Sequence, residues 1–247
     1  MSYNTNSDVG LPSFEHTLKE AANGIKSLIC FTGGLDSSYC VWKYAQATPH
    51  DTIDCHHVNF NQPRFHTEFA TIHKISKYIK TTFGKDINLI KTSLSIDPNY
   101  NVKVTNDGYV ASYLSIGYAA KLKCAYIVTG DDLPQSYERT LSYTEIPTFS
   151  KMSKIGLNIL SSNNKMGKST MVVGTEAVNL SELYNEMPKD YVKLLFSCYT
   201  PNYYVNHKRW YAGRCRTCSS CSTLRNFGWF DETCDKILKE DIGDIKW

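Results

Sequence analysis

Long apolar runs are missing from this chain of 247 residues. The first 27 residues are polar and contain no apolar core of the length that a secretory signal needs. No later run approaches the roughly 20 apolar residues that span a membrane as a helix. These absences argue against secreted and membrane-embedded proteins, and we expect a soluble protein of the cytoplasm.

A strong excess of charge of one sign is also missing. The formal net charge is +3, charged residues make up 21% of the chain and hydrophobic residues 42%, as in ordinary globular proteins. This mild balance neither requires nor excludes a nucleic-acid partner. The length suits one large α/β domain, or such a domain with an appendage.

The cysteines do not form an even set, because there are nine of them. An odd number without a secretory signal argues against a disulfide framework. Four lie in apolar segments and are expected to be buried thiols, namely Cys30, Cys40, Cys55 and Cys124. Cys234 is expected to be a spare thiol on a terminal helix, and the other four form a cluster described below.

The most informative segment that is present runs from Phe31 to Ser38, with the sequence Phe-Thr-Gly-Gly-Leu-Asp-Ser-Ser. An apolar run leads into it and a predicted helix over residues 37–46 leaves it. Two glycines let backbone N–H groups approach an oxyanion, and the start of a helix directs its positive dipole end to the same place. The candidate binding residues are Thr32, Gly33, Gly34, Leu35, Asp36, Ser37 and Ser38, with Asp36 as a Mg²⁺ ligand or helix cap.

Hydrophobic patterns predict alternating strands and helices. We expect strands over residues 27–31, 53–60, 87–91 and 125–129, and helices over residues 14–22, 37–46, 66–83 and 107–122. This alternation predicts an α/β fold with a parallel, doubly wound sheet, whose ligands bind at the carboxyl ends of the strands. That edge would gather residues 32–38, 59–62 and 130–132, including Asn59, Gln62 and Gly130.

The predicted domain organisation has three parts. Residues 1–24 form an N-terminal arm, residues 25–150 form the α/β core, and residues 151–247 form a helical and zinc-binding C-terminal region. Residues 140–170, which cross the last of these boundaries, are expected to be a long polar excursion. Residues 175–197 are expected to be helical, and a final helix is expected over residues 231–239.

Closely spaced cysteines form the second strong signal. Cys215, Cys218 and Cys221 follow one another at two-residue spacing, and Cys198 lies upstream. Four thiolates with no open position are typical of a structural Zn²⁺, whereas three cysteines at this spacing also suit an iron–sulfur cluster. We favour zinc because a structural site fits a loop-rich context. His207 is an alternative fourth ligand.

The glycine-rich segment resembles the pyrophosphate loop of the N-type ATP pyrophosphatases, Ser-Gly-Gly-x-Asp-Ser, with Thr32 in place of the first serine. The resemblance implies an adenine nucleotide alpha hydrolase-like fold that cleaves ATP between its alpha and beta phosphates. A substrate oxygen is then adenylated, and a nucleophile displaces AMP. Residues 167–170 look like the end of a Walker A loop, but Ser162 stands where that motif needs glycine.

A narrower resemblance joins the loop to the cysteines. Ser197-Cys198-Tyr199, followed by the three spaced cysteines and Arg225, is similar to the QueC family of 7-cyano-7-deazaguanine (preQ0) synthases. Residues 59–68 resemble that family's Tyr-Gly-Gln-Arg-His-x-x-Glu region, stretched by one residue. The resemblance implies conversion of 7-carboxy-7-deazaguanine and ammonia to an amide or nitrile through an adenylated carboxylate, for modification of tRNA or DNA.

Several departures from the family's pattern indicate that this chain is a divergent member. A phage is one source that we consider, and the protein would then act in the cytoplasm of the host. The spacer between Cys198 and Cys215 is longer than in the family, and an arginine expected near Asn106 is missing. The family's Gly-Tyr-Pro-Asp-Cys-Arg segment is reduced to residues 136–139.

The resemblance implies roles for named residues. The loop would hold pyrophosphate, Asp36 or Asp131 would hold Mg²⁺, and Asn59 to Gln62 would border the adenosine of ATP. Arg139 is the candidate partner of the substrate carboxylate, so the predicted catalytic residues are Asp36, Asp131 and Arg139. The predicted zinc ligands are Cys198, Cys215, Cys218 and Cys221.

Two other functions remain open. One is a tRNA-modifying enzyme that adenylates a base for thiolation or amination, supported by basic residues beside Trp210, namely Lys208, Arg209, Arg214 and Arg216. A solvated surface explains the same residues, and we expect a small acid in preference to nucleic acid as the substrate. The other is a catalytically degenerate nucleotide-binding protein. A homodimer is compatible with all of these functions.

Overall fold

The computed structural model describes residues 12–60, 62, 64–94, 107–130, 170–173, 180–206, 209–226 and 237–238. Its centre is a five-stranded parallel sheet with the strand order β3-β2-β1-β4-β5. The strands are β1 (Ser27–Cys30), β2 (Thr52–Asn59), β3 (Asp86–Ser93), β4 (Tyr126–Thr129) and β5 (Thr170–Val173). The sequence-based prediction of a parallel α/β sheet is therefore confirmed, and β5 adds a strand where we expected a polar excursion to end.

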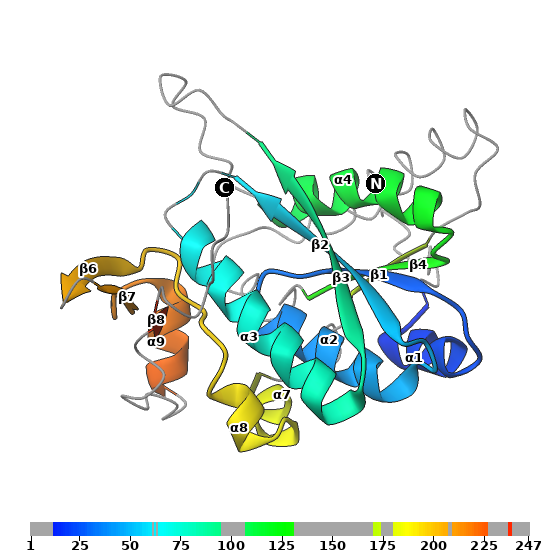
Figure 1. Cartoon of the computed structure of the whole chain (residues 1–247), viewed down its shortest axis with the longest axis horizontal. Helices are drawn as coiled ribbons and strands as arrows, with labels where there is room; N and C mark the ends of the chain where they lie inside the picture. The colour runs from blue at the N-terminus through cyan, green and yellow to red at the C-terminus, as the bar shows by residue number, and fades with distance from the viewer. Residues whose placement is uncertain are drawn as a thin grey trace, which may run out of the picture.

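Helices cover both faces of the sheet, which makes it doubly wound (Figure 1). On one face α2 (Leu35–Ala47) and α3 (Phe65–Phe83) pack on β1 and β2. The same hydrophobic cluster includes residues of α1 (Phe14–Ala22), α7 (Leu180–Glu186) and α8 (Lys189–Val192). On the other face α4 (Asp107–Leu122) packs on Leu28 and Ile127. Leu28 and Ile29 are both fully buried, as neighbouring residues of a strand covered on two faces must be.

Local sequence explains where these helices begin and end. Ser13 caps α1 by accepting a hydrogen bond from the backbone N–H of His16 at 3.1 Å. Gly84 ends α3 in the left-handed conformation, with φ +72°. The helix α2 begins two residues before the expected Ser37, because Gly34 is its N-cap. That shift places Asp36 in the first turn.

Of two C-terminal expectations, one is confirmed in part and the other is wrong. The region expected to be helical forms two short helices, because Pro188 cannot continue α7 and becomes the N-cap of α8. The final helix predicted over residues 231–239 is wrong at Ile237–Leu238, which form strand β8. This strand pairs antiparallel with β7 (Arg209–Gly213) and so covers one edge of it. The rest of that predicted helix lies outside the described residues.

A small second unit carries the cysteines. We define the cysteine module as residues 195–226 together with β8. Strands β6 (Asn202–Asn206) and β7 form an antiparallel hairpin, and α9 (Ser219–Asn226) follows. The module lies beside the N-terminal half of α3 (Figure 1). Within the described part of the chain, none of the helices has the length and apolar character needed to cross a bilayer.

Candidate nucleotide site and metal centre

The glycine-rich loop lies at the switch point of the sheet. The chain runs from β1 to β2 and β3 on one side, and β4 and β5 lie on the other side of β1. In open α/β sheets, ligands bind outside the carboxyl ends of the strands where the order reverses. The loop joins the carboxyl end of β1 to the start of α2, so the fold places it where such a ligand would bind.

Gly33 is required by both conformation and space. Its φ is +76°, which favours glycine, and a Cβ there would lie 3.0 Å from the Thr71 Cβ and 3.1 Å from the Glu68 carbonyl oxygen. The loop is thus pressed against α3, and Gly33 is buried there, whereas Thr32 is exposed and Gly34 is half-buried. At Gly34 the missing side chain leaves the partly exposed backbone open to close approach by an anion.

Hydrogen-bond donors converge on the start of α2. Its first N–H groups have no partner inside the helix, and the N–H of Leu35 donates to the Ser197 hydroxyl at 3.0 Å. The hydroxyls of Thr32 and Ser37 lie 3.0 Å apart, and the Thr32 N–H donates to the Ser37 oxygen at 3.2 Å. The positive end of a 13-residue helix adds to these donors. The site is chemically suited to bind an anion such as a phosphate.

Three buried hydroxyls near this loop have no hydrogen-bond partner among the described residues. They belong to Ser38 in the first turns of α2, Thr71 beside Gly33 on α3, and Thr129 at the end of β4. Buried polar groups in native proteins are almost always hydrogen-bonded. Their grouping is consistent with a polar ligand or ordered water at this edge of the sheet.

Gly130 brings the end of β4 against the start of α2. A Cβ on Gly130 would lie only 2.4 Å from the Ser37 backbone nitrogen and 2.7 Å from its Cα. Sequence reasoning placed Gly130 in the binding site, and the structure places it directly beside the loop. Its small size lets β4 and α2 approach each other.

Replacing Gly130 by alanine should therefore destabilise the protein by about 1–3 kcal/mol, because the clash is with backbone and no rotamer change relieves it. The matched control is Gly117→Ala in α4, where a Cβ meets nothing within 4 Å. That variant should be neutral or stabilised by about 0.5–1 kcal/mol, as alanine is the better helix former. Chemical denaturation measures both, and equal stabilities would contradict this role of Gly130.

The remaining predicted binding residues lie at the same edge or outside the described residues. Asn59 ends β2, and its carbonyl accepts a hydrogen bond from the N–H of Leu94. Gln62 precedes α3 and accepts one from the N–H of Phe65. Asp36 lies in the first turn of α2, next to the loop. Asp131 and Arg139 lie outside the described residues, so their catalytic roles stay predictions.

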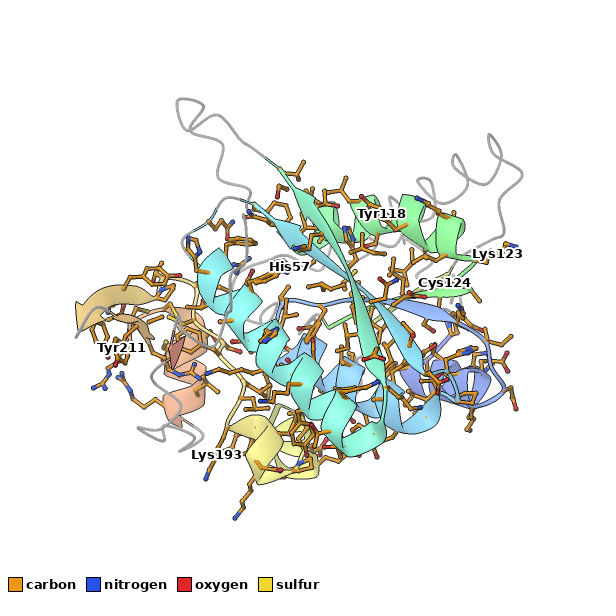
Figure 2. All side chains as sticks on the ribbon, in the orientation of Figure 1. His57, Tyr118, Lys123, Cys124, Lys193 and Tyr211 are labelled. Carbon is orange, nitrogen blue, oxygen red and sulfur yellow. The ribbon has the colours of Figure 1, made fainter. Side chains whose placement is uncertain are left out.

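Sequence reasoning missed a buried histidine–glutamate pair beside the loop. His57 on β2 lies beside the first turns of α3 (Figure 2), with its Nε2 3.7 Å from the Glu68 Oε2. Its Nδ1 lies 3.0 Å from the carbonyl oxygen of Phe31, which only accepts, so Nδ1 carries the proton. Burial lowers the pKa of His57 to about 4. Burial also raises the pKa of Glu68 to about 7. The positive charge of Arg64, whose Nε lies 3.0 Å from the Glu68 Oε1, lowers this pKa but does not offset the effect of burial.

The raised pKa of Glu68 predicts a pH dependence of stability. Folding favours the protonated form of Glu68. Its contribution to the free energy of unfolding is therefore complete below the ordinary pKa of 4.5 and is lost as the pH rises through the folded-state pKa of about 7. Between pH 5 and 8 we expect the wild type to lose about 2–3 kcal/mol relative to Glu68→Gln. Denaturant titrations at several pH values measure the difference, and parallel pH profiles would contradict it.

The four predicted metal ligands come together. The Sγ atoms of Cys198, Cys215, Cys218 and Cys221 all lie within 4.8 Å of one another, and those of Cys215 and Cys221 are 3.9 Å apart. Backbone N–H groups point at two of the sulfurs, from Cys215 to Cys198 and from Cys218 to Cys215. Cys198 lies in the fourth position, and His207, the alternative ligand, lies outside the described residues. The cluster is therefore a candidate metal centre.

Local hydrogen bonds favour a thiolate at Cys215. Burial raises the pKa of the Cys215 thiol. Hydrogen bonds from the Thr200 hydroxyl and from the N–H groups of Thr217 and Cys218 outweigh burial, so the pKa falls to about 5. Thiolates are the form that binds metal. Burial raises the pKa of the Cys198 and Cys221 thiols. A bound cation would compensate that cost.

The hairpin explains the long spacer in the cysteine motif. Strands β6 and β7 occupy the residues between Cys198 and Cys215 and return the chain to the same point. The cysteines then pack on Phe65 and Phe69 of α3. Arg214, expected in a basic surface group, turns inward: its Nη1 donates to the Ser197 carbonyl at 2.9 Å and its guanidinium lies over the Phe196 ring. It therefore supports the module.

Comparison with known proteins gives little further information. No family model matches the chain, and no curated protein matches it. Among solved structures, the chain is similar to the U34-tRNA thiolase NcsA from Methanococcus maripaludis with its 4Fe-4S cluster. The TM-score is 0.46 and the identity 14%, over 87% of this chain and 71% of that one. A likeness this distant decides neither the substrate nor the metal.

Proposed function

We propose that the protein is an ATP-dependent ligase that adenylates a substrate oxygen and releases pyrophosphate. The observation that carries this proposal is the glycine-rich loop at the switch point, where the half-buried Gly34, the start of α2 and a group of hydroxyls converge. Its sequence also resembles the pyrophosphate loop of the N-type ATP pyrophosphatases.

The proposed reaction has two displacements. A substrate carboxylate oxygen bonds to the alpha phosphorus of ATP while the bond from that phosphorus to the pyrophosphate oxygen breaks. Ammonia then attacks the carboxyl carbon, loses a proton, and expels AMP as the carbon–nitrogen bond forms. The N–H groups of the loop and the hydroxyls of Thr32, Ser37 and Ser38 would stabilise the charge on the departing pyrophosphate. Asp36 would hold the Mg²⁺ that neutralises that charge.

The proposed substrate is 7-carboxy-7-deazaguanine, and the two displacements give its amide. The nitrile forms if the amide oxygen then displaces pyrophosphate from a second ATP and leaves with AMP, while the nitrogen loses two protons. The support for this substrate is the sequence resemblance to the preQ0 synthases, which covers the loop, the Ser-Cys-Tyr segment, the spaced cysteines and Arg225. Asn59 and Gln62 would border the adenosine, since both lie at the same edge of the sheet as the loop. Arg139 is proposed to pair with the substrate carboxylate on sequence grounds alone.

The proposed metal is one structural Zn²⁺ in the cysteine module. Four sulfurs arranged tetrahedrally at zinc–sulfur distances of about 2.3 Å would lie about 3.8 Å from one another. The measured spacing of 3.9 Å for one pair, with all four within 4.8 Å, fits a single ion. In a four-iron cluster each thiolate binds a different iron, which holds the sulfurs further apart. The fit therefore favours a single ion.

A second candidate substrate is a base in RNA, and a separate observation favours it. Among the described residues, three of the four exposed large hydrophobic side chains lie in the cysteine module: Tyr199 at 51% exposure, and Tyr203 and Tyr204 at 38% each. Between Asp190 and Asp231 the sequence has no acidic residue and six lysines and arginines, of which Arg214 faces inward. Exposed aromatic and basic side chains together are typical of surfaces that bind single-stranded nucleic acid.

One experiment separates these possibilities. Purified protein is incubated with ATP, Mg²⁺ and ammonium, with either 7-carboxy-7-deazaguanine or bulk tRNA, and nucleotides and products are read by mass spectrometry. The proposal predicts AMP, pyrophosphate and an amide or nitrile with the deazapurine. AMP release that requires tRNA would support the second candidate. ADP as the product would refute both, and no turnover with either substrate would favour a catalytically degenerate nucleotide-binding protein.

A further inference from the structure

We propose that Ser197 is a nucleotide-binding residue that couples occupancy of the metal centre to nucleotide binding at the glycine-rich loop. This inference rests on the proposed function, because it takes the loop to be the phosphate site. It adds a physical link between two sites that the sequence presents as separate motifs.

Ser197 belongs to both sites at once. Its hydroxyl oxygen accepts a hydrogen bond at 3.0 Å from the N–H of Leu35, a residue 162 positions earlier at the start of α2. A Cβ on Gly34 would lie 3.5 Å from the same oxygen. The next residue in the chain is Cys198, the first metal ligand. The residue that contacts the loop is therefore the direct neighbour in the chain of a metal ligand.

The other side of Ser197 is held by neighbours of the remaining ligands. Its carbonyl oxygen accepts hydrogen bonds at 2.9 Å from the Arg214 Nη1 and at 2.9 Å from the Ser220 hydroxyl. Arg214 directly precedes Cys215, and Ser220 directly precedes Cys221. The residues before three of the four ligands thus form one hydrogen-bonded group centred on Ser197. A metal that holds these cysteines together holds Ser197 in place.

The position of Ser197 suits a direct role toward an anion. A hydroxyl has one donor and two acceptor sites, so a hydroxyl that accepts from the Leu35 N–H keeps its own proton available. That proton can be donated to a phosphate oxygen at the loop. Loss of metal would release Ser197 and remove this donor. Because coupling between two sites is reciprocal, bound nucleotide must then also stabilise bound metal.

The test measures zinc release into a chromophoric chelator, with and without saturating α,β-methylene-ATP, on the full-length protein. The wild type should release zinc about 5- to 50-fold more slowly with the analogue, within the usual range of coupling between sites. Ser197→Ala should keep about one zinc per chain, bind the analogue about 5- to 10-fold more weakly by calorimetry, and lose the protection of zinc. Ser197→Thr, which keeps the hydroxyl, should restore both.

The matched control is Ser222→Ala, an exposed serine of the same module, which should behave as the wild type. The coupling is refuted if the analogue binds the wild type without slowing zinc release, or if Ser197→Ala keeps the full protection. Failure of the wild type to bind the analogue at all would instead refute the proposed function. Should Ser197→Ala fail to fold with zinc, the wild-type comparison and Ser197→Thr still decide the matter.

Discussion

Replacing Asp36 by alanine is expected to lower the rate of pyrophosphate release about 100- to 1,000-fold, the loss typical when one electrostatic stabiliser of a transition state is removed. Asp36 lies in the first turn of α2 beside Gly34, and its Oδ1 atom is buried. A carboxylate there would hold the Mg²⁺ that neutralises the departing pyrophosphate. A coupled pyrophosphate assay with ATP, ammonium and the acid substrate measures the effect.

The control for Asp36 is Glu15→Ala. Both residues are acidic and lie in the first turn of a helix, where each contributes about 0.3–1 kcal/mol through the helix dipole. Glu15 is exposed on α1 and should affect stability alone, with unchanged activity. If Asp36→Ala keeps wild-type turnover, the assignment of Asp36 to the metal–phosphate site fails.

Replacing Cys221 by serine is expected to give protein that is insoluble or lacks zinc. Cys221 is fully buried and its sulfur belongs to the four-sulfur cluster. Binding of a structural Zn²⁺ supplies about 10–16 kcal/mol, which is comparable to the whole stability of a typical domain. The soluble fraction and the metal content per chain, measured by elemental analysis, test the prediction.

Cys124→Ser is the matched control for the metal centre. Cys124 is also a buried thiol, but it packs beneath α4 with Leu28 and Ile127, far along the chain from the cluster. Its replacement should cost about 1–3 kcal/mol for burying a hydroxyl, while zinc stays at about one per chain. A brown wild-type protein with iron and acid-labile sulfide, prepared without oxygen, would overturn the zinc assignment.

The sequence alone determined the features that a few adjacent residues specify. The period of apolar residues predicted α4 at residues 107–122 without error. The alternation of strands and helices predicted the parallel sheet and its binding edge. The spacing of three cysteines predicted a metal centre, and the two glycines predicted an anion loop. Each depends on local turn chemistry or periodicity, which neighbouring residues specify by themselves.

Only the tertiary structure decided which distant segments meet. Ser197 reaches the start of α2 across 162 positions, and no local pattern specifies such a contact. The same holds for Gly130 against Ser37 and for the pairing of β8 with β7, which replaced an expected helix. His57 and Glu68 were missed because β2 and α3 bring them together only after packing. These contacts arise from docking of whole elements, whose energy depends on the assembled core and not on the period or spacing within any one segment.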